Sequence, residues 1–245
     1  MRRITDLPRE RERAHQWIRA ALTTLAGAAA VLAVGQQPSQ DKKPNALGPV
    51  SFRAHKVSSP PVIDGSIVPE EWLNAATASK FMDQQHQPEQ GKTTFYLQYD
   101  EKYVYFAAVV TESHRPKATA TGTNVPFGID DMIVLQFDTF GEGKNDGLNF
   151  CSINGRGATN FRKAGGSSQK REWRGSFEGS AKIADDGWTV EARVPWSIFR
   201  MPKSGTRNLR FNFVRTDSVT ENPYWYYLPK ETENVSGVIW EGVEV

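Results

Sequence analysis

The stretch that decides the fold runs from residue 93 to residue 110 and reads TTFYLQY (93–99), DEK (100–102) and YVYFAAVV (103–110). The two outer segments are rich in β-branched and aromatic residues, which favour extended backbone. The charged segment between them is typical of a turn. The last segment is apolar on both faces, as expected of a strand in the middle of a two-layer structure. The stretch therefore predicts a β-hairpin whose second strand is buried.

Similar strand signals recur along the chain. Alternating or apolar runs predict further strands at 132–138, 148–153, 158–162, 177–184, 188–194 and 209–214. Turn sequences such as Asn154-Gly155 and Asp185-Asp186-Gly187 separate them. Only two short segments have a helical pattern with proline in the first turn, at 69–76 and 195–200. Many short strands without βαβ alternation predict an all-β fold, a β-sandwich of mostly antiparallel strands with two short helices.

The composition is that of an ordinary folded protein. The 245 residues are 38% hydrophobic, 24% charged and 11% aromatic. These values exclude a polytopic membrane protein, a collagen-like chain and a wholly disordered chain. The first 35 residues contain six arginines and three acidic residues, so the net charge of +2 becomes −1 without them. The charge therefore gives no support for nucleic-acid binding, which needs a basic face on the folded domain.

The amino-terminal segment has the pattern of a secretory signal peptide. Arginines precede an uncharged run of 15 residues from Ala20 to Val34, shorter than the ~20 residues that cross a bilayer as a helix. We expect residues 1–35 to be a cleaved signal peptide, with an uncleaved anchor as the alternative, and residues 36–50 to be a linker. The domain at 51–245 is then secreted or periplasmic, without stable membrane insertion.

The single cysteine, Cys151, excludes an intramolecular disulfide. Residues 148–153 alternate like a strand, which predicts a buried structural thiol. Stability must therefore come from a hydrophobic core, and a mature chain of about 210 residues buries close to ~70% of its unfolded surface.

The order of four sequence blocks resembles family 9 carbohydrate-binding modules. The blocks are PVIDG with EW (61–65, 71–72), YVYFAAVVTE (103–112), DDMIVLQFD (130–138) and DGWTVEARVPW (186–196). The resemblance covers residues 57–228 and implies a jelly-roll-like β-sandwich, in agreement with the strand pattern. It extends to a subgroup in which the module forms the amino-terminal part of large outer-membrane or periplasmic proteins.

The resemblance implies an aromatic clamp, because sugar-binding members of this family hold a terminal sugar between two tryptophans. The second tryptophan and the asparagine before it correspond to Trp225 and Asn222. The first tryptophan would fall just before Asp131, where this chain offers Phe127 as a substitute. An acidic side chain usual three residues after that aspartate is replaced by Val134.

Trp173 and Arg215 complete the candidate sugar site. Aromatic rings contact the C–H face of a sugar, and fixed polar side chains bind its hydroxyls. Trp173 lies in the charged segment KREWR (170–174), which is poor core material. Trp72 and Trp188, in contrast, are expected in the core. For Trp225, an ordinary strand position is the alternative.

The acidic residues predict structural roles and no enzyme. A glycosidase needs two carboxylates across a cleft. The adjacent Asp130 and Asp131 would point to opposite faces of a strand, and no spacing brings Glu191 and Asp138 together.

The loop 141–147 is a candidate for a structural Ca²⁺ ion. The residues Asp138, Glu142 and Asp146 offer the oxygen ligands that Ca²⁺ prefers, although they do not reproduce an EF-hand loop. A solvated loop is the alternative, and no other cofactor is expected.

These features together predict an exported, non-catalytic carbohydrate-binding module that holds an oligo- or polysaccharide and serves carbohydrate catabolism. A separate enzyme or an envelope protein is the expected protein partner. The alternative is a structural or protein-interaction β-sandwich without a sugar site.

Overall fold

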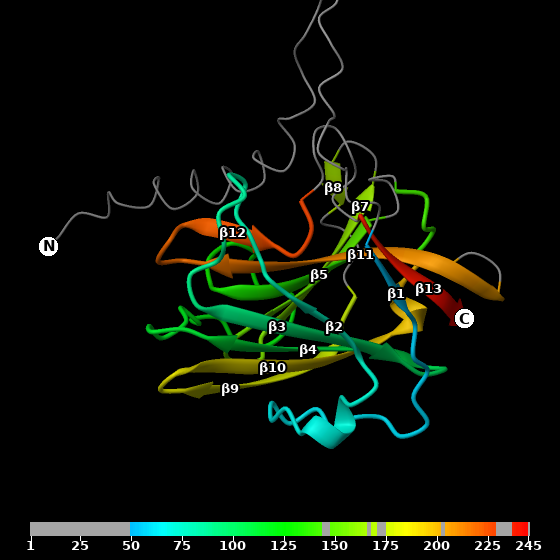
Figure 1. The fold of residues 1–245 in the computed structure, drawn as a ribbon, viewed down its shortest axis with the longest axis horizontal. Coiled ribbons are helices and arrows are strands. Elements are labelled where there is room, and N and C mark those ends of the chain that lie inside the picture. Colours follow the sequence, from blue (N-terminus) through cyan, green and yellow to red (C-terminus); the bar gives the residue numbers. More distant parts are fainter. Residues whose placement is uncertain are drawn as a thin grey trace, which may run out of the picture.

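The fold is described from a computed structural model of the chain (Figure 1). The structure describes residues 50–143, 148–165, 168–170, 175–201, 204–228 and 237–244. The predicted signal peptide, and the predicted linker apart from its last residue, lie outside the described residues.

The larger of two sheets has eight strands among the described residues. Its order is β1 (Ser51–Arg53), β13 (Val238–Glu244), β11 (Thr206–Asp217), β5 (Met132–Asp138), β6 (Leu148–Asn154), β7 (Thr159–Gly165) and β8 (Ser168–Lys170). The short strand β12 (Asn222–Trp225) pairs with β11 as well. All these pairs are antiparallel except β1 with β13.

The smaller sheet has five strands in the described part of the chain, and all are antiparallel. Its order is β2 (Ala76–Ser79), β3 (Lys92–Tyr99), β4 (Tyr103–Thr111), β10 (Gly187–Pro195) and β9 (Glu178–Ala184). The hairpin predicted at 93–110 is therefore confirmed as β3 and β4, with β4 between β3 and β10. Figure 1 shows the two sheets as stacked layers, which confirms the predicted β-sandwich.

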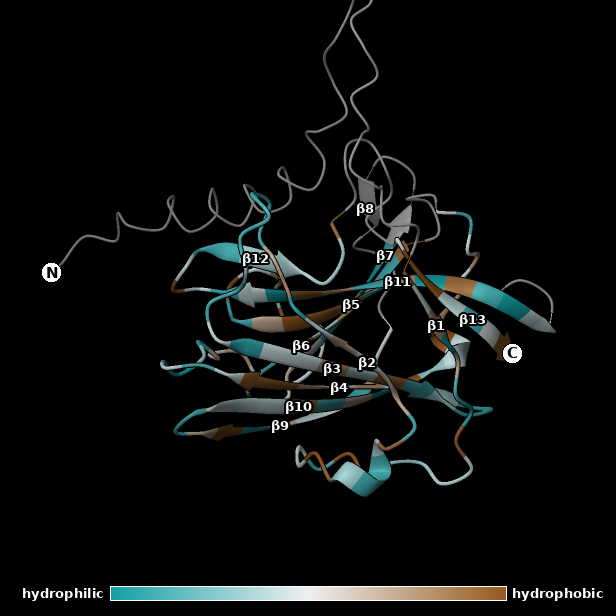
Figure 2. Cartoon of the chain, viewed as in Figure 1, coloured by the Kyte–Doolittle hydropathy of each residue, from teal (hydrophilic) through white to brown (hydrophobic). Residues whose placement is uncertain are grey.

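An aromatic core joins the two sheets. The rings of Phe95 in β3 and Phe213 in β11 stack with centroids 4.0 Å apart. Figure 2 shows brown, hydrophobic residues on strands such as β4 and β5. Cys151 in β6 is buried in this core, and burial raises the pKa of its thiol. The thiol is therefore structural, as predicted.

The two predicted helices are single 3₁₀ turns, η2 (Pro69–Glu71) and η4 (Trp196–Ile198). Proline begins η2 and immediately precedes η4, consistent with its preference for the first turn. The chain is already extended again at Phe199, so η4 ends after one turn.

The strands β1, β12 and β13 were not predicted from the sequence. The strands β1 and β12 have three and four residues, too few for a clear alternation. Pro223 also lies in β12, where an edge position tolerates a residue without a backbone N–H. In β13 the alternation is interrupted by Gly242, whose φ is +74°.

A buried carboxylate fastens residues 61–75 to the outer face of the smaller sheet. One oxygen of Glu191 in β10 accepts the backbone N–H groups of Asp64 (3.1 Å) and Gly65 (2.8 Å). The other accepts the indole N–H of Trp72 (3.1 Å), which is buried as predicted. Burial raises the pKa of Glu191, and these hydrogen bonds offset only part of the shift. Glu191 therefore has a structural role.

We predict that Glu191→Ala lowers the free energy of unfolding by about 3 kcal/mol or more, because each buried donor left unpaired costs about 1–3 kcal/mol. Urea denaturation measures this change. The control is Glu178→Ala on the paired strand β9, which removes an exposed ion pair with Arg193 and is expected to cost no more than about 1 kcal/mol. Equal losses in the two variants would contradict the role of Glu191.

Candidate functional site

The outer face of the larger sheet carries aromatic and polar side chains together. Successive residues of a strand point to opposite faces, so neighbours of core residues point away from the smaller sheet. One row across this face consists of Trp225, Val214, Val134, Ser152 and Asn160. The row beside it consists of Asn212, Gln136, Phe150 and Arg162. We call these two rows, with Phe127, the outer-face site.

The aromatic part of the site is a small apolar cluster. Trp225 is 8% exposed and packs with Val134 and Val214. Phe127, from the loop before β5, is half-buried and packs against the same cluster. The guanidinium of Arg162 lies 3.8 Å from the centroid of the Phe127 ring, and 5.2 Å from that of Phe150. These are cation–π distances, so Arg162 holds the two phenylalanines together.

The polar part of the site contains buried oxygen atoms without partners. Gln136 Oε1, Ser152 Oγ and Asn160 Oδ1 have no hydrogen-bond partner among the described residues. The amide nitrogen of Asn160 donates to the backbone oxygen of Val125 at 2.8 Å, which holds that side chain in place. A buried polar atom without a partner costs about 1–3 kcal/mol, so three in adjacent positions point to a ligand.

Asp130 fastens the loop 112–131 that carries Phe127. Its carboxylate accepts the backbone N–H groups of Thr119 (2.8 Å) and Ala120 (2.9 Å), and the side-chain N–H of Asn154 in β6 (2.7 Å). Burial alone would raise the pKa of Asp130, but the hydrogen bonds outweigh it and lower the pKa. The ionised carboxylate is therefore the form that holds the loop against the sheet.

The other carboxylates considered for catalysis also hold loops. Asp131 accepts the backbone N–H groups of Lys117 (2.7 Å) and Ser218 (2.6 Å). Each carboxylate in this group therefore has its own set of backbone donors, which accounts for its burial.

Two of the predicted sugar-site residues come together, Trp225 and Phe127, in one cluster. The burial of Trp225 differs from the partly exposed platform that the sequence led us to expect. Asn222 is exposed at the start of β12, in register with Asp217 of β11. Trp173 lies outside the described residues.

Arg215 does not reach this face. It is the residue after Val214 in β11, so it points toward the smaller sheet, where it is 1% exposed. Its guanidinium forms ion pairs with Glu89, Glu112 and Asp217. The predicted role of Arg215 as a sugar ligand is therefore replaced by a buried ionic one.

The candidate calcium loop is held by backbone hydrogen bonds in its described part. The carboxylate of Asp138 is buried and accepts the N–H groups of Phe140 (3.0 Å), Gly141 (3.1 Å) and Gly143 (2.8 Å). Glu142 is exposed, and Asp146 lies outside the described residues. These contacts favour the alternative of an ordinary loop, and Ca²⁺ binding stays a prediction.

The sequence analysis missed Gln136, Ser152, Asn160 and Arg162. A signal for them exists, because Asn160 and Arg162 flank the core residue Phe161, and Gln136 interrupts an apolar strand. A single sequence shows such polar positions but not which of them share a face across three strands.

We predict that Trp225→Ala lowers the free energy of unfolding by about 3–5 kcal/mol, the usual cost of truncating a buried tryptophan. Denaturant midpoints measure the loss. Leu73→Ala is the apolar control, because Leu73 is 79% exposed and its truncation should cost no more than about 0.5 kcal/mol. A Trp225→Ala variant that is as stable as the wild type would contradict the core role and support an exposed aromatic platform instead.

We predict that the stabilising effect of Asp130 disappears in acid. Its pKa is lowered in the folded state, so its contribution is complete above the unfolded pKa of about 3.9 and is lost as pH falls through the folded pKa. The difference in unfolding free energy between the wild type and Asp130→Asn should shrink over that range. Asp185→Asn, in an exposed turn, is the control, and a pH-independent difference for Asp130→Asn would contradict the loop-anchor role.

Three solved structures share the fold. A family 9 carbohydrate-binding module from Caldicellulosiruptor kristjanssonii in complex with cellotriose is 19% identical, with TM-score 0.51, over 80% of this chain and 94% of that one. A family 9 module from this organism in complex with glucose is 19% identical, with TM-score 0.52, over 79% of this chain and 97% of that one. A protein from Bacteroides uniformis, whose name gives carbohydrate binding as its expected role, is 14% identical, with TM-score 0.60, over 78% of this chain and 98% of that one.

No curated protein sequence matches the chain significantly. The model of a protein family described as "Carbohydrate family 9 binding domain-like" matches residues 63–223. The match spans both sheets, from the segment fastened by Glu191 to the strand that carries Trp225. The chain therefore belongs to the carbohydrate family 9 binding domain-like family.

Proposed function

We propose that this chain is an exported, non-catalytic module that binds a glycan on the outer face of its larger sheet. The observation that carries the proposal is the set of three buried oxygens without described partners, Gln136 Oε1, Ser152 Oγ and Asn160 Oδ1. They lie beside the aromatic cluster of Trp225 and Phe127. Sugar hydroxyls would donate hydrogen bonds to these oxygens while a C–H face of the sugar contacts an aromatic ring.

Each part of the site has a distinct task in this proposal. Phe127 is the half-buried ring available for stacking. When the sugar binds, the guanidinium of Arg162 moves off the ring of Phe127, so that the ring can contact the sugar. The N–H groups of Arg162 then donate to sugar oxygens. Trp225 supports the floor of the site from within the cluster instead of standing open. The recognition groups are amides, a hydroxyl and a guanidinium, which suits a neutral sugar.

The substrate class follows the structural neighbours. The modules from Caldicellulosiruptor kristjanssonii bind cellotriose and glucose. Glucose and short glucose oligomers are therefore the first probes. The role in carbohydrate catabolism would be to keep a separate enzyme or an envelope protein close to the glycan, and the chain itself would perform no hydrolysis.

Export is proposed from the signal-peptide pattern of residues 1–35. Among the described residues, no helix has the length and apolar character needed to cross a membrane. The secreted or periplasmic location then places the module where extracellular or envelope glycans occur.

The second candidate is a structural or protein-interaction sandwich, and two observations favour it. Trp225 is 8% exposed, and Arg162 covers one face of Phe127. Neither feature matches an open, preformed aromatic platform.

We predict that Gln136→Leu weakens binding of cellotriose without destabilising the protein. The substitution removes a buried amide oxygen that has no described partner, so the free energy of unfolding should stay the same or rise. The lost sugar contact should lower affinity by about fivefold to tenfold, which corresponds to about 1–1.5 kcal/mol. Isothermal titration calorimetry and urea denaturation of the same preparation separate the two effects.

The aromatic contact is tested in the same titrations with Phe127→Ala, which should lower affinity by about tenfold or more. The control is Phe140→Ala, because Phe140 is also half-buried beside an arginine, with Arg200 lying 5.9 Å from its ring centroid. Equal affinities in all variants would reject the outer-face site. No binding in a broad glycan screen would reject the sugar function and leave the interaction module.

A further inference from the structure

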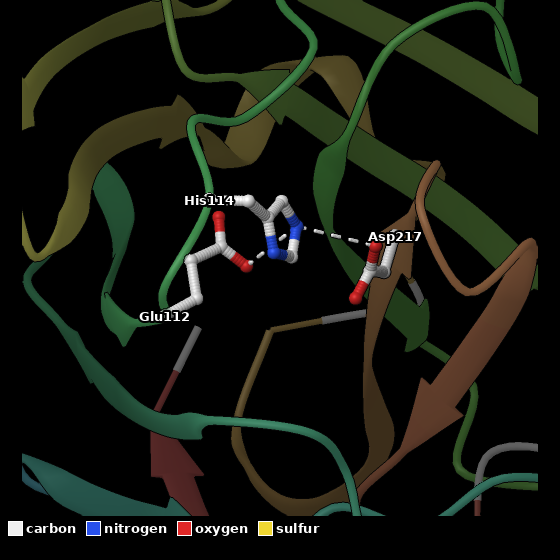
Figure 3. A group of neighbouring side chains, drawn as sticks. All are labelled: Glu112, His114 and Asp217. Carbon is white, nitrogen blue, oxygen red and sulfur yellow. Dashed lines mark ion pairs between the residues drawn. The ribbon is translucent and has the colours of Figure 1, made fainter.

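A second cluster of chemically active side chains lies away from the outer-face site, where the two sheets meet at one end. Glu112 follows the last residue of β4 in the smaller sheet, and His114 lies in the loop after it. Asp217 is the last residue of β11 in the larger sheet. Figure 3 shows the imidazole of His114 between the two carboxylates.

The geometry of these three residues matches that of a zinc site. His114 Nε2 lies 3.4 Å from Glu112 Oε2 and 3.4 Å from Asp217 Oδ1. The three potential ligand atoms all lie within 4.8 Å of one another. A tetrahedral ion with bonds of about 2.0–2.1 Å places neighbouring ligand atoms about 3.3–3.4 Å apart. Two edges of the cluster therefore have the required length.

The state of the imidazole is an independent observation. His114 Nε2 is buried and has no hydrogen-bond partner among the described residues, although it points between two carboxylates. The side chain as a whole is 26% exposed, so one side of the cluster is open to solvent. A metal ion would supply the missing partner of Nε2, and solvent access would supply a fourth ligand.

The surrounding groups hold the carboxylates in place. The other oxygen of Glu112 accepts the indole N–H of Trp188 at 2.8 Å. Asp217 Oδ1 accepts the backbone N–H groups of Val219 (2.9 Å) and Thr220 (3.3 Å). Arg215 contacts both Glu112 and Asp217. Such outer contacts orient the ligands of a metal site and raise its affinity.

The charge balance also favours a cation. The buried side chains of Glu89, Glu112 and Asp217 surround one guanidinium, that of Arg215. The negative charge is therefore only partly compensated by the protein. A divalent ion would complete the compensation.

We propose that Glu112, His114 and Asp217 form a binding site for Zn²⁺ that links the two sheets. An imidazole with two carboxylates suits Zn²⁺ better than Ca²⁺, which takes six to eight oxygen ligands. Arg215 keeps its contacts with Asp217 Oδ2 and with one lone pair of Glu112 Oε2, and the ion uses the remaining lone pair of Glu112 Oε2. On Asp217 Oδ1 the ion takes the place of the long hydrogen bond from the backbone N–H of Thr220 (3.3 Å). The site is independent of the proposed sugar function.

The experiment titrates the untagged chain with Zn²⁺ by calorimetry and follows its thermal unfolding. We expect one ion per chain, and a higher melting temperature in excess Zn²⁺ because the ion binds the native state. His114→Ala should lower the affinity by about a hundredfold or more, since even outer contacts are worth 10–100-fold. X-ray absorption should show nitrogen and oxygen ligands at about 2.0–2.1 Å and no sulfur.

The matched control is His55→Ala, which removes an exposed histidine and should leave the affinity unchanged. Asp217→Asn keeps an acceptor for Val219 but removes the charge, and should also weaken binding. Absence of one-to-one binding would overturn the proposal, as would binding that survives His114→Ala. A His114→Ala variant that is destabilised without any Zn²⁺ effect in the wild type would identify a charged imidazole bridging the carboxylates instead.

Discussion

A loop that crosses a sheet brings its backbone N–H groups with it, and each buried N–H needs an acceptor. In this sandwich, which has a single buried cysteine and no disulfide, carboxylates are the acceptors. Glu191 binds residues 61–75 to the smaller sheet, and Asp130 binds the loop that carries Phe127 to the larger one. Asp138 does the same for the turn after β5. The outer faces of both sheets are shaped by these contacts, so the position of the candidate sugar site depends on them.

The same constraint decides which groups remain for ligand recognition. A carboxylate that accepts two or three backbone N–H groups has most of its lone pairs occupied, so it is poorly placed to act as a general acid. The outer-face site is instead built from Gln136, Ser152 and Asn160, which are neutral and contain buried oxygens without described partners. At the end of the sandwich, by contrast, the carboxylates of Glu112 and Asp217 face the imidazole of His114.

The fold was largely predictable because strand alternation is local. The hairpin at 93–110 and the apolar strand at 132–138 could be identified from residue type alone, and the family resemblance agreed with them. The short edge strands could not, since three or four residues carry too little pattern. The site was less predictable than the fold. Trp225 and Phe127 could be named from the motif, but the contact of Phe127 with Arg162 joins residues 35 positions apart and depends on the loop fastened by Asp130.

Arg215 shows why residue type alone misplaces a ligand. Arg215 directly follows Val214 in the strand, so the two side chains point to opposite faces of the sheet. Val214 lies beside Trp225 in the outer row, whereas Arg215 lies between the sheets against Glu112 and Asp217. An arginine on the outer face would meet a sugar, but the same arginine on the inner face neutralises carboxylates. The strand β11 thus contributes to both proposed sites from opposite faces, and substitutions at its two faces should affect the two ligands separately.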